Sequence, residues 1–195
     1  MNRGPVSANL TKVTAPKSTL LIIFLFCQLA SAEITPGRWV LACASGVART
    51  QLFKESSVTL TESFHQDRDC LDLSFEFITS GDVIYPQADN IDFTYRRVFL
   101  ALHKNALIDD FNARRVCGIS QWTLHAPVDI TGRECAIFNF TKTTKIPSDG
   151  DTKFGIYRID DGGLIYGKLT RENDGSSPQR RPVTFEAERI YYLKR

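Results

Sequence analysis

The sequence lacks the side-chain groupings on which metal binding and hydrolytic catalysis usually depend. Its three histidines, His65, His103 and His125, lie far apart and do not share the helical or strand spacing of a metal motif. It contains no nucleophile-elbow motif and no glycine-rich loop of the kind that holds a phosphate. We therefore expect a protein that is not an enzyme and that uses no metal ion and no cofactor.

A strong excess of one charge is also missing. The full chain has 24 basic and 22 acidic side chains. Residues 1–32 contain three basic side chains, Arg3, Lys12 and Lys17, and no acid, so the remaining chain has 21 basic against 22 acidic groups. This near-neutral mixture of charges argues against a nucleic-acid partner.

Long apolar runs are confined to one place near the N-terminus. Leu20–Cys27 is apolar throughout, follows a basic stretch and precedes Ala30-Ser31-Ala32, a small-residue pattern that signal peptidase cleaves. The run is shorter than the roughly 20 residues of a membrane-spanning helix. We predict a signal peptide over residues 1–32, followed by one domain over residues 33–195 that is secreted or periplasmic and has no transmembrane segment.

Beyond the predicted signal peptide the chain has four cysteines: Cys43, Cys70, Cys117 and Cys135. An even number in an exported protein indicates disulfides, with three possible connectivities. We favour the nearest-neighbour pairing, Cys43–Cys70 and Cys117–Cys135, whose loops would each stabilise the fold by roughly 3–4 kcal/mol in the chain-entropy model. A zinc site is the alternative, although no two of these cysteines have the short ligand spacing that zinc sites use.

Most of the remaining signals are those of antiparallel strands. Gly37-Arg38-Trp39 opens the first strand, and a glycine followed by a tryptophan is typical of the start of a closed barrel. Alternating apolar and polar residues predict further strands over residues 50–64, 71–77, 91–102, 121–124, 135–140, 153–159, 164–169 and 182–193. Ser80-Gly81-Asp82 is interpreted as a turn and residues 160–163 as a tight hairpin.

Two features interrupt this pattern. The apolar parity changes at Arg96-Arg97, which indicates either a bulge or a turn. Residues 105–115 have apolar residues three or four apart and predict the one helix, with Asn105 as a candidate cap. The elements together predict an all-β fold, a closed antiparallel barrel of the calycin or lipocalin type with about eight or nine strands and one short helix.

Arg189 is an anomaly because it falls on the apolar face of the last predicted strand. An unpaired buried charge is costly, so this arginine needs a partner. In lipocalin-type barrels an arginine of the last strand lies across the tryptophan of the first strand, which makes Trp39 and Arg189 a candidate structural pair. The alternative is a strand end that emerges into water and leaves Arg189 exposed.

The aromatic content suggests a ligand cavity. The chain has 13 phenylalanines, six tyrosines and two tryptophans, mostly on predicted strands. Apolar walls with a few polar anchors are typical of small-molecule pockets, and we expect a hydrophobic small molecule or lipid inside the barrel. The candidate ligand-binding residues are Phe75, Phe77, Phe93, Tyr95, Trp122, Phe138, Tyr166 and Phe185. A solid core of packed rings is the alternative, and Arg97 or Arg158 is a candidate partner for a ligand carboxylate.

An ordered set of motifs runs along the predicted domain. It comprises Gly37-Arg38-Trp39-Val40, Phe64-His65-Gln66-Asp67 before Cys70, Phe111-Asn112 before Cys117-Gly118, Tyr157-Arg158-Ile159-Asp160, and Asp174-Gly175-Ser176-Ser177-Pro178. This order resembles one barrel domain of the adenomatosis polyposis coli down-regulated protein family, which are extracellular Wnt antagonists. The chain differs from that family in having one such domain rather than two and in having no terminal membrane anchor.

The resemblance implies a calycin-like barrel with an apolar cavity suited to an acyl chain. Because Wnt proteins carry a lipid, it also implies a lipidated protein as a further candidate partner. Two functions follow as expectations: a secreted carrier of a fatty-acyl or similar ligand, or an extracellular interaction module of the Wnt-antagonist type that acts through its loops without a small-molecule ligand. Asn139-Phe140-Thr141 matches the glycosylation acceptor pattern, although its strand-like setting argues against its use.

Overall fold

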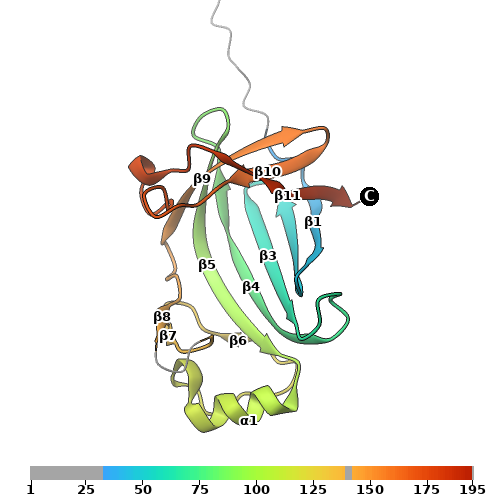
Figure 1. Ribbon diagram of the computed structural model, residues 1–195. Coiled ribbons are helices and arrows are strands. Elements are labelled where there is room, and N and C mark those ends of the chain that lie inside the picture. The colour runs from blue at the N-terminus through green and yellow to red at the C-terminus, as the bar shows by residue number, and fades with distance from the viewer. Residues whose placement is uncertain (1–32, 139–141, 195) are drawn as a thin grey trace, which may run out of the picture.

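The fold is a closed antiparallel barrel of eight strands (Figure 1). The structure is a computed structural model that describes residues 33–138 and 142–194, so the predicted signal peptide and Asn139 lie outside the described residues. The barrel strands are β1 (Gly37–Ala44), β2 (Val47–Lys54), β3 (Ser57–His65), β4 (Leu73–Ile84), β5 (Asn90–Leu102), β9 (Thr152–Asp160), β10 (Gly163–Gly167) and β11 (Phe185–Lys194). Each strand pairs with the next in this order, and β11 pairs with β1. The predicted barrel is confirmed.

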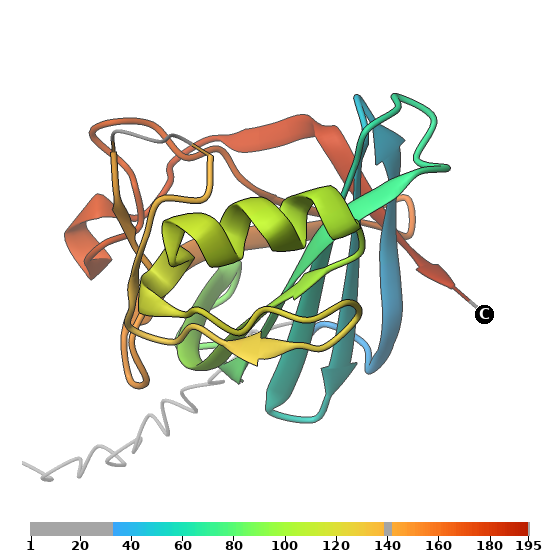
Figure 2. The same cartoon turned by 90° about the horizontal axis from the view of Figure 1, so that it is seen from below.

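The segment between β5 and β9 covers one end of the barrel. It contains α1 (Asn105–Arg114), the 3-10 turn η1 (Val116–Gly118) and the short strands β6 (Val128–Asp129), β7 (Glu134–Cys135) and β8 (Thr144–Lys145). β6 extends the sheet at β5, and β7 pairs with β8. Figure 2, seen from below, shows α1 lying across this end. A second 3-10 turn, η2 (Pro178–Arg180), lies in the connection between β10 and β11.

The barrel interior contains two apolar clusters. One lies between the strands at the Trp39 end and includes Phe53 and Leu164. The other joins the lower half of β5 to the covering segment, where Leu100 packs with Trp122. Trp122 meets Phe111 of α1 edge to face, with ring centroids 5.5 Å apart. The covering segment is therefore held in place by the same apolar burial that fills the lower barrel.

The change of apolar parity in β5 is a β-bulge. Ser80 of β4 lies opposite Arg97, whereas the next residue, Gly81, lies opposite Tyr95, so Arg96 is the extra residue. The bulge keeps the odd-numbered residues before it and the even-numbered residues after it on the inner face. The bulge interpretation is confirmed and the alternative of a turn is wrong.

Gly81 is not a turn residue, as the sequence suggested, because β4 continues through it to Ile84. A Cβ atom on this glycine would lie 2.4 Å from the Thr94 carbonyl oxygen and 2.5 Å from the Phe93 ring. The two strands approach too closely at the bulge for any side chain at this position. Glycine here marks a close contact between strands rather than the end of a strand.

Other strand predictions need correction. Residues 50–64 form the β2–β3 hairpin rather than one strand, with Lys54 paired to Ser57 and Glu55 at a φ of 48°. Residues 121–124 form no strand beyond one isolated bridge at Leu124. Of residues 135–140, Cys135 alone is in a strand among those described. The tight hairpin is confirmed, since Asp161 and Gly162 both have positive φ between β9 and β10.

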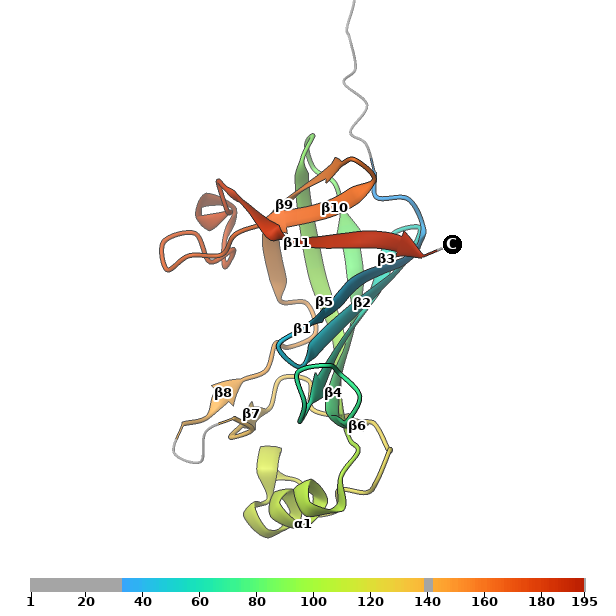
Figure 3. The ribbon, with the colours of Figure 1, turned by 45° about the vertical axis from the view of Figure 1, so that its right-hand side comes forward.

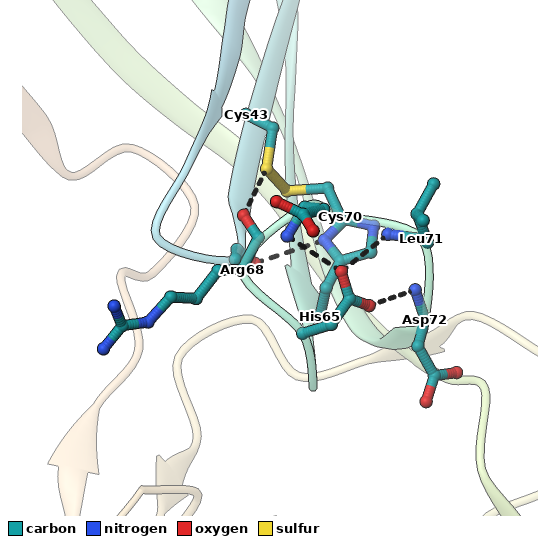
Figure 4. The surroundings of a disulfide bond; sticks show 9 residues. Cys43, His65, Arg68, Cys70, Leu71 and Asp72 are labelled. Carbon is teal, nitrogen blue, oxygen red and sulfur yellow. Dashed lines mark hydrogen bonds between the residues drawn. A yellow bond between two sulfur atoms is a disulfide. The ribbon is translucent and has the colours of Figure 1, made fainter.

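Both predicted disulfides are confirmed. Cys43–Cys70 has a Cα–Cα distance of 6.0 Å, and Cys117–Cys135 one of 4.2 Å. Figure 4 shows the first, which joins the end of β1 to the loop after β3. In that loop the Asp67 carboxylate accepts hydrogen bonds from several backbone N–H groups. The hydrogen bond from the Leu71 N–H contributes most to holding the pKa of Asp67 below its usual value. Disulfides of this kind fit an oxidising compartment.

The predicted contact between Trp39 and Arg189 is wrong. The Arg189 side chain is 52% exposed and forms an ion pair with Glu186 at 3.3 Å. Trp39 lies opposite Leu193, four residues further along β11, which places it about 13 Å from Arg189 at the usual strand rise. The buried Trp39 indole instead donates to the Thr35 carbonyl at 3.0 Å. The exposed position of Arg189 is the alternative that the sequence left open.

The long connection between β10 and β11 is attached to the outer face of β5 and β9 by Arg181. Its guanidinium lies 2.7 Å from the Asp92 carboxylate, and the two side chains are 15% and 10% exposed. The same guanidinium donates to the backbone carbonyl of Gly155 at 2.6 Å and to that of Ile91 at 3.3 Å. This ion pair is almost fully removed from water.

We expect Arg181→Ala to lower the free energy of unfolding by about 3–5 kcal/mol, because it leaves the Asp92 carboxylate buried without its charge partner. Urea denaturation measures the change. Arg97→Ala is the control, since Arg97 is 61% exposed in its pair with Asp129 and such pairs contribute about 0–1 kcal/mol. Equal losses in the two variants would contradict the assignment of Arg181 as the main attachment.

Candidate functional site

A cavity of about 220 Å³ lies inside the upper half of the barrel. Six strands, β2, β3, β4, β5, β9 and β10, contribute residues to its wall. The lining residues are Gln51, Phe53, Val58, Leu60, Val83, Ile91, Phe93, Tyr95, Lys153, Gly155 and Tyr166. Strand alternation selects them, because every second residue of each strand faces inward. Most of this wall is apolar, and its polar groups come from Gln51, Lys153 and the two tyrosines.

The polar atoms of the cavity wall are mostly paired. The Tyr166 hydroxyl donates to Gln51 Oε1 at 2.5 Å. Burial raises the pKa of Tyr166 well above its usual value, so this hydroxyl stays protonated. The Lys153 ammonium donates to the backbone carbonyl of Asp174, and its aliphatic stem lines the cavity. The wall thus combines an apolar surface with a small set of oriented polar groups, as ligand sites do.

A second, more polar hollow of about 200 Å³ adjoins the first. It shares Gln51 and Leu60 with the apolar cavity and adds Arg49, Glu62 and Tyr191. Arg49 Nε lies 2.5 Å from Glu62 Oε1. We call the first space the apolar cavity and the second the polar hollow. The barrel interior thus has an apolar space and, next to it, a more polar one.

The predicted site residues divide between this cavity and other places. Phe93, Tyr95 and Tyr166 line the apolar cavity. Trp122 is buried beneath α1, where its backbone N–H donates to Asn112 Oδ1 at 2.7 Å. Phe185 lies under the Arg158 guanidinium, 4.7 Å from ring centroid to Cζ.

The other three predicted rings form an aromatic cluster in the lower barrel. Phe75 stacks on Phe64 with centroids 4.7 Å apart, and Phe77 and Phe138 lie within 6.0 Å of both. Phe138 is 67% exposed, so this cluster reaches the surface. The eight predicted residues therefore do not form one continuous wall. Neither arginine proposed for a ligand carboxylate lines the cavity. Arg97 pairs with Asp129, and Arg158 lies over the Phe185 ring.

Sequence reasoning missed four polar residues of the interior: Arg49, Gln51, Glu62 and Lys153. It also treated the histidines as isolated. His103 Nδ1 lies 2.8 Å from His125 Nδ1, and His103 Nε2 lies 3.0 Å from Glu76 Oε2. Because the histidines are 22 residues apart in two different loops, no local spacing could have revealed this pair. No cluster of three or more possible metal ligands occurs in residues 33–138 and 142–194.

No family model matches the chain, and no curated protein matches it. The resemblance to the adenomatosis polyposis coli down-regulated family therefore stays a prediction. Within the described part of the chain, no helix has the length and apolar character needed to cross a membrane.

The buried tyrosines predict a loss of stability at alkaline pH. Burial raises the pKa of Tyr85 to about 12 and also raises those of Tyr95, Tyr166 and Tyr191. A tyrosine in the unfolded chain ionises at about pH 10. Above that pH the unfolded chain therefore binds fewer protons than the folded one. The stabilisation is complete below about pH 10 and is lost as pH rises through the folded pKa values.

Urea unfolding at a series of pH values from about 9 to 11 should therefore show a falling free energy of unfolding. Tyr166→Phe removes one contributing group and should reduce the slope above about pH 10. An unchanged slope in this variant would show that Tyr166 does not resist ionisation in the folded protein.

Proposed function

We propose that this protein is a secreted or periplasmic carrier that binds a hydrophobic small molecule or a lipid chain inside its barrel, without catalysing a reaction. The observation that supports this proposal most directly is the apolar cavity, which residues of six strands line. The two disulfides agree with an oxidising compartment, where exported binding proteins function. The resemblance to the extracellular Wnt-antagonist family points in the same direction.

The size of the cavity limits the ligand. An apolar protein cavity of about 150 Å³ is large enough to hold benzene, and this one measures about 220 Å³. Most sites for drug-sized molecules span roughly 300–1,000 Å³. A single ring or a medium-length acyl segment matches this space, and a longer molecule would extend into the polar hollow. Each methylene group that enters contributes about 0.8 kcal/mol of transfer free energy.

The test is to purify the chain from its export compartment, record its native mass spectrum and extract bound lipids. We expect a bound apolar species that accompanies the folded protein and appears in the organic extract. A folded protein without any such species, which captures a stoichiometric protein partner instead, would favour the alternative of an interaction module acting through its loops.

A pair of phenylalanine substitutions separates the cavity from the outer surface. Val58→Phe places a ring in the cavity wall, and we expect at least a tenfold loss of ligand retention, equivalent to about 1.4 kcal/mol. Leu52→Phe is the matched control, because Leu52 is 39% exposed on the outer face of the neighbouring strand. Competition with a fluorescent fatty-acid analogue measures both. Equal affinities in the two variants would exclude the apolar cavity as the binding site.

A further inference from the structure

Arg49 has an unusual position for a partly buried arginine. It lies on β2 two residues before Gln51, so strand alternation puts its side chain on the inner face of the barrel. Its side chain is 24% exposed, and it borders the polar hollow directly beside the apolar cavity. The guanidinium is therefore fixed next to a space that an apolar chain can occupy.

The guanidinium uses only part of its hydrogen-bonding capacity. Its Nε atom binds Glu62, while Nη1 and Nη2 have no hydrogen-bond or ion-pair partner among the described residues. A guanidinium carries five N–H donors, and its two terminal nitrogens form a planar fork that matches a carboxylate. The two terminal nitrogens of Arg49 are thus able to bind a carboxylate in addition to the Nε contact with Glu62.

The charged side chains that line the polar hollow are Arg49 and Glu62. The Lys153 ammonium donates to the Asp174 carbonyl, so only the stem of that side chain lines the apolar cavity. The exposed Arg189 is paired with Glu186. Arg49 is therefore the cation beside these two spaces whose N–H donors are available to a carboxylate.

The polar hollow lies close to the place where β1 and β11 separate. The two strands are paired through Arg38, Trp39 and Val40 of β1, and a hollow of about 680 Å³ borders both strands beyond them. Figure 3 shows β11 diverging from β1 away from the C-terminus. Arg49 lies opposite Leu41, the first residue of β1 after the paired part. A head group held by Arg49 would lie on the inner face of the sheet, next to this divergence.

We propose that the ligand is an amphipathic carboxylate, an acyl chain of medium length that lies in the apolar cavity while its carboxylate binds Nη1 and Nη2 of Arg49. The inference rests on the proposed function and adds the head group, its anchor and its direction of entry. The tail enters first between β1 and β11, and the charged end stays near water, which avoids burying an unpaired carboxylate.

Decanoate and 1-decanol test the proposal, because they share one chain length and differ in charge. Isothermal titration at neutral pH should give decanoate about 10- to 100-fold tighter binding than decanol, as expected for charge-assisted hydrogen bonds. Arg49→Gln should remove this preference while changing decanol affinity less than about threefold. Arg97→Gln, on the outer surface, is the matched control and should leave both affinities unchanged.

Two further variants make the assignment specific. Glu62→Gln removes the acid beside Arg49 and should strengthen decanoate binding several-fold, because it frees Nε and removes like-charge repulsion. The double variant Arg49→Gln/Glu62→Gln leaves neither charge unpaired, and it should lose the preference for decanoate even where Arg49→Gln alone folds poorly. Lys153→Gln should retain most of that preference.

The outcomes separate this inference from the proposed function. Equal binding of decanoate and decanol by the wild-type protein, or a preference that survives Arg49→Gln, would overturn the assignment of Arg49 and leave the apolar cavity in place. A preference lost only in Lys153→Gln would overturn it equally. Binding of neither probe to the folded protein would contradict the apolar carrier function itself.

Discussion

Closure of the sheet depends on a short line of backbone pairing between the first and the last strand. Three residues of β1 pair with three of β11, at Arg38–Lys194, Trp39–Leu193 and Val40–Tyr192. This pairing satisfies the two edges that would otherwise be exposed and turns an open sheet into a barrel with an interior. Because it is short, the strands diverge beyond it, and a hollow of about 680 Å³ borders both strands there.

The interior is divided in two by the bulge at Arg96. Above it, the inward residues of β5 border the apolar cavity, and below it they pack against the covering segment that contains α1. The lower half is filled by Trp122 and Leu100, which are 2% and 0% exposed. The division explains why rings of similar sequence setting, such as Phe77 and Phe93, have different surroundings.

The sequence was most informative where a structural feature depends on neighbouring residues. The bulge, the Asp161-Gly162 hairpin and the cysteine pairs follow from local parity, from positive φ and from proximity along the chain. The Glu55-Ser56 turn has no glycine, proline or asparagine, so the sequence predicts a single strand where the structure has a hairpin.

The polar interior escaped sequence reasoning for a physical reason. Arg49 and Gln51 alternate along β2, and such a pattern is typical of the wet face of a strand. In this barrel that face points inward. Stability alone does not account for the arrangement, because the Arg49–Glu62 pair is partly exposed, at 24% and 41%, and such pairs contribute only about 0–1 kcal/mol. The proposed recognition of a charged head group would give this arginine, which borders a hollow beside the apolar cavity, a role beyond stability.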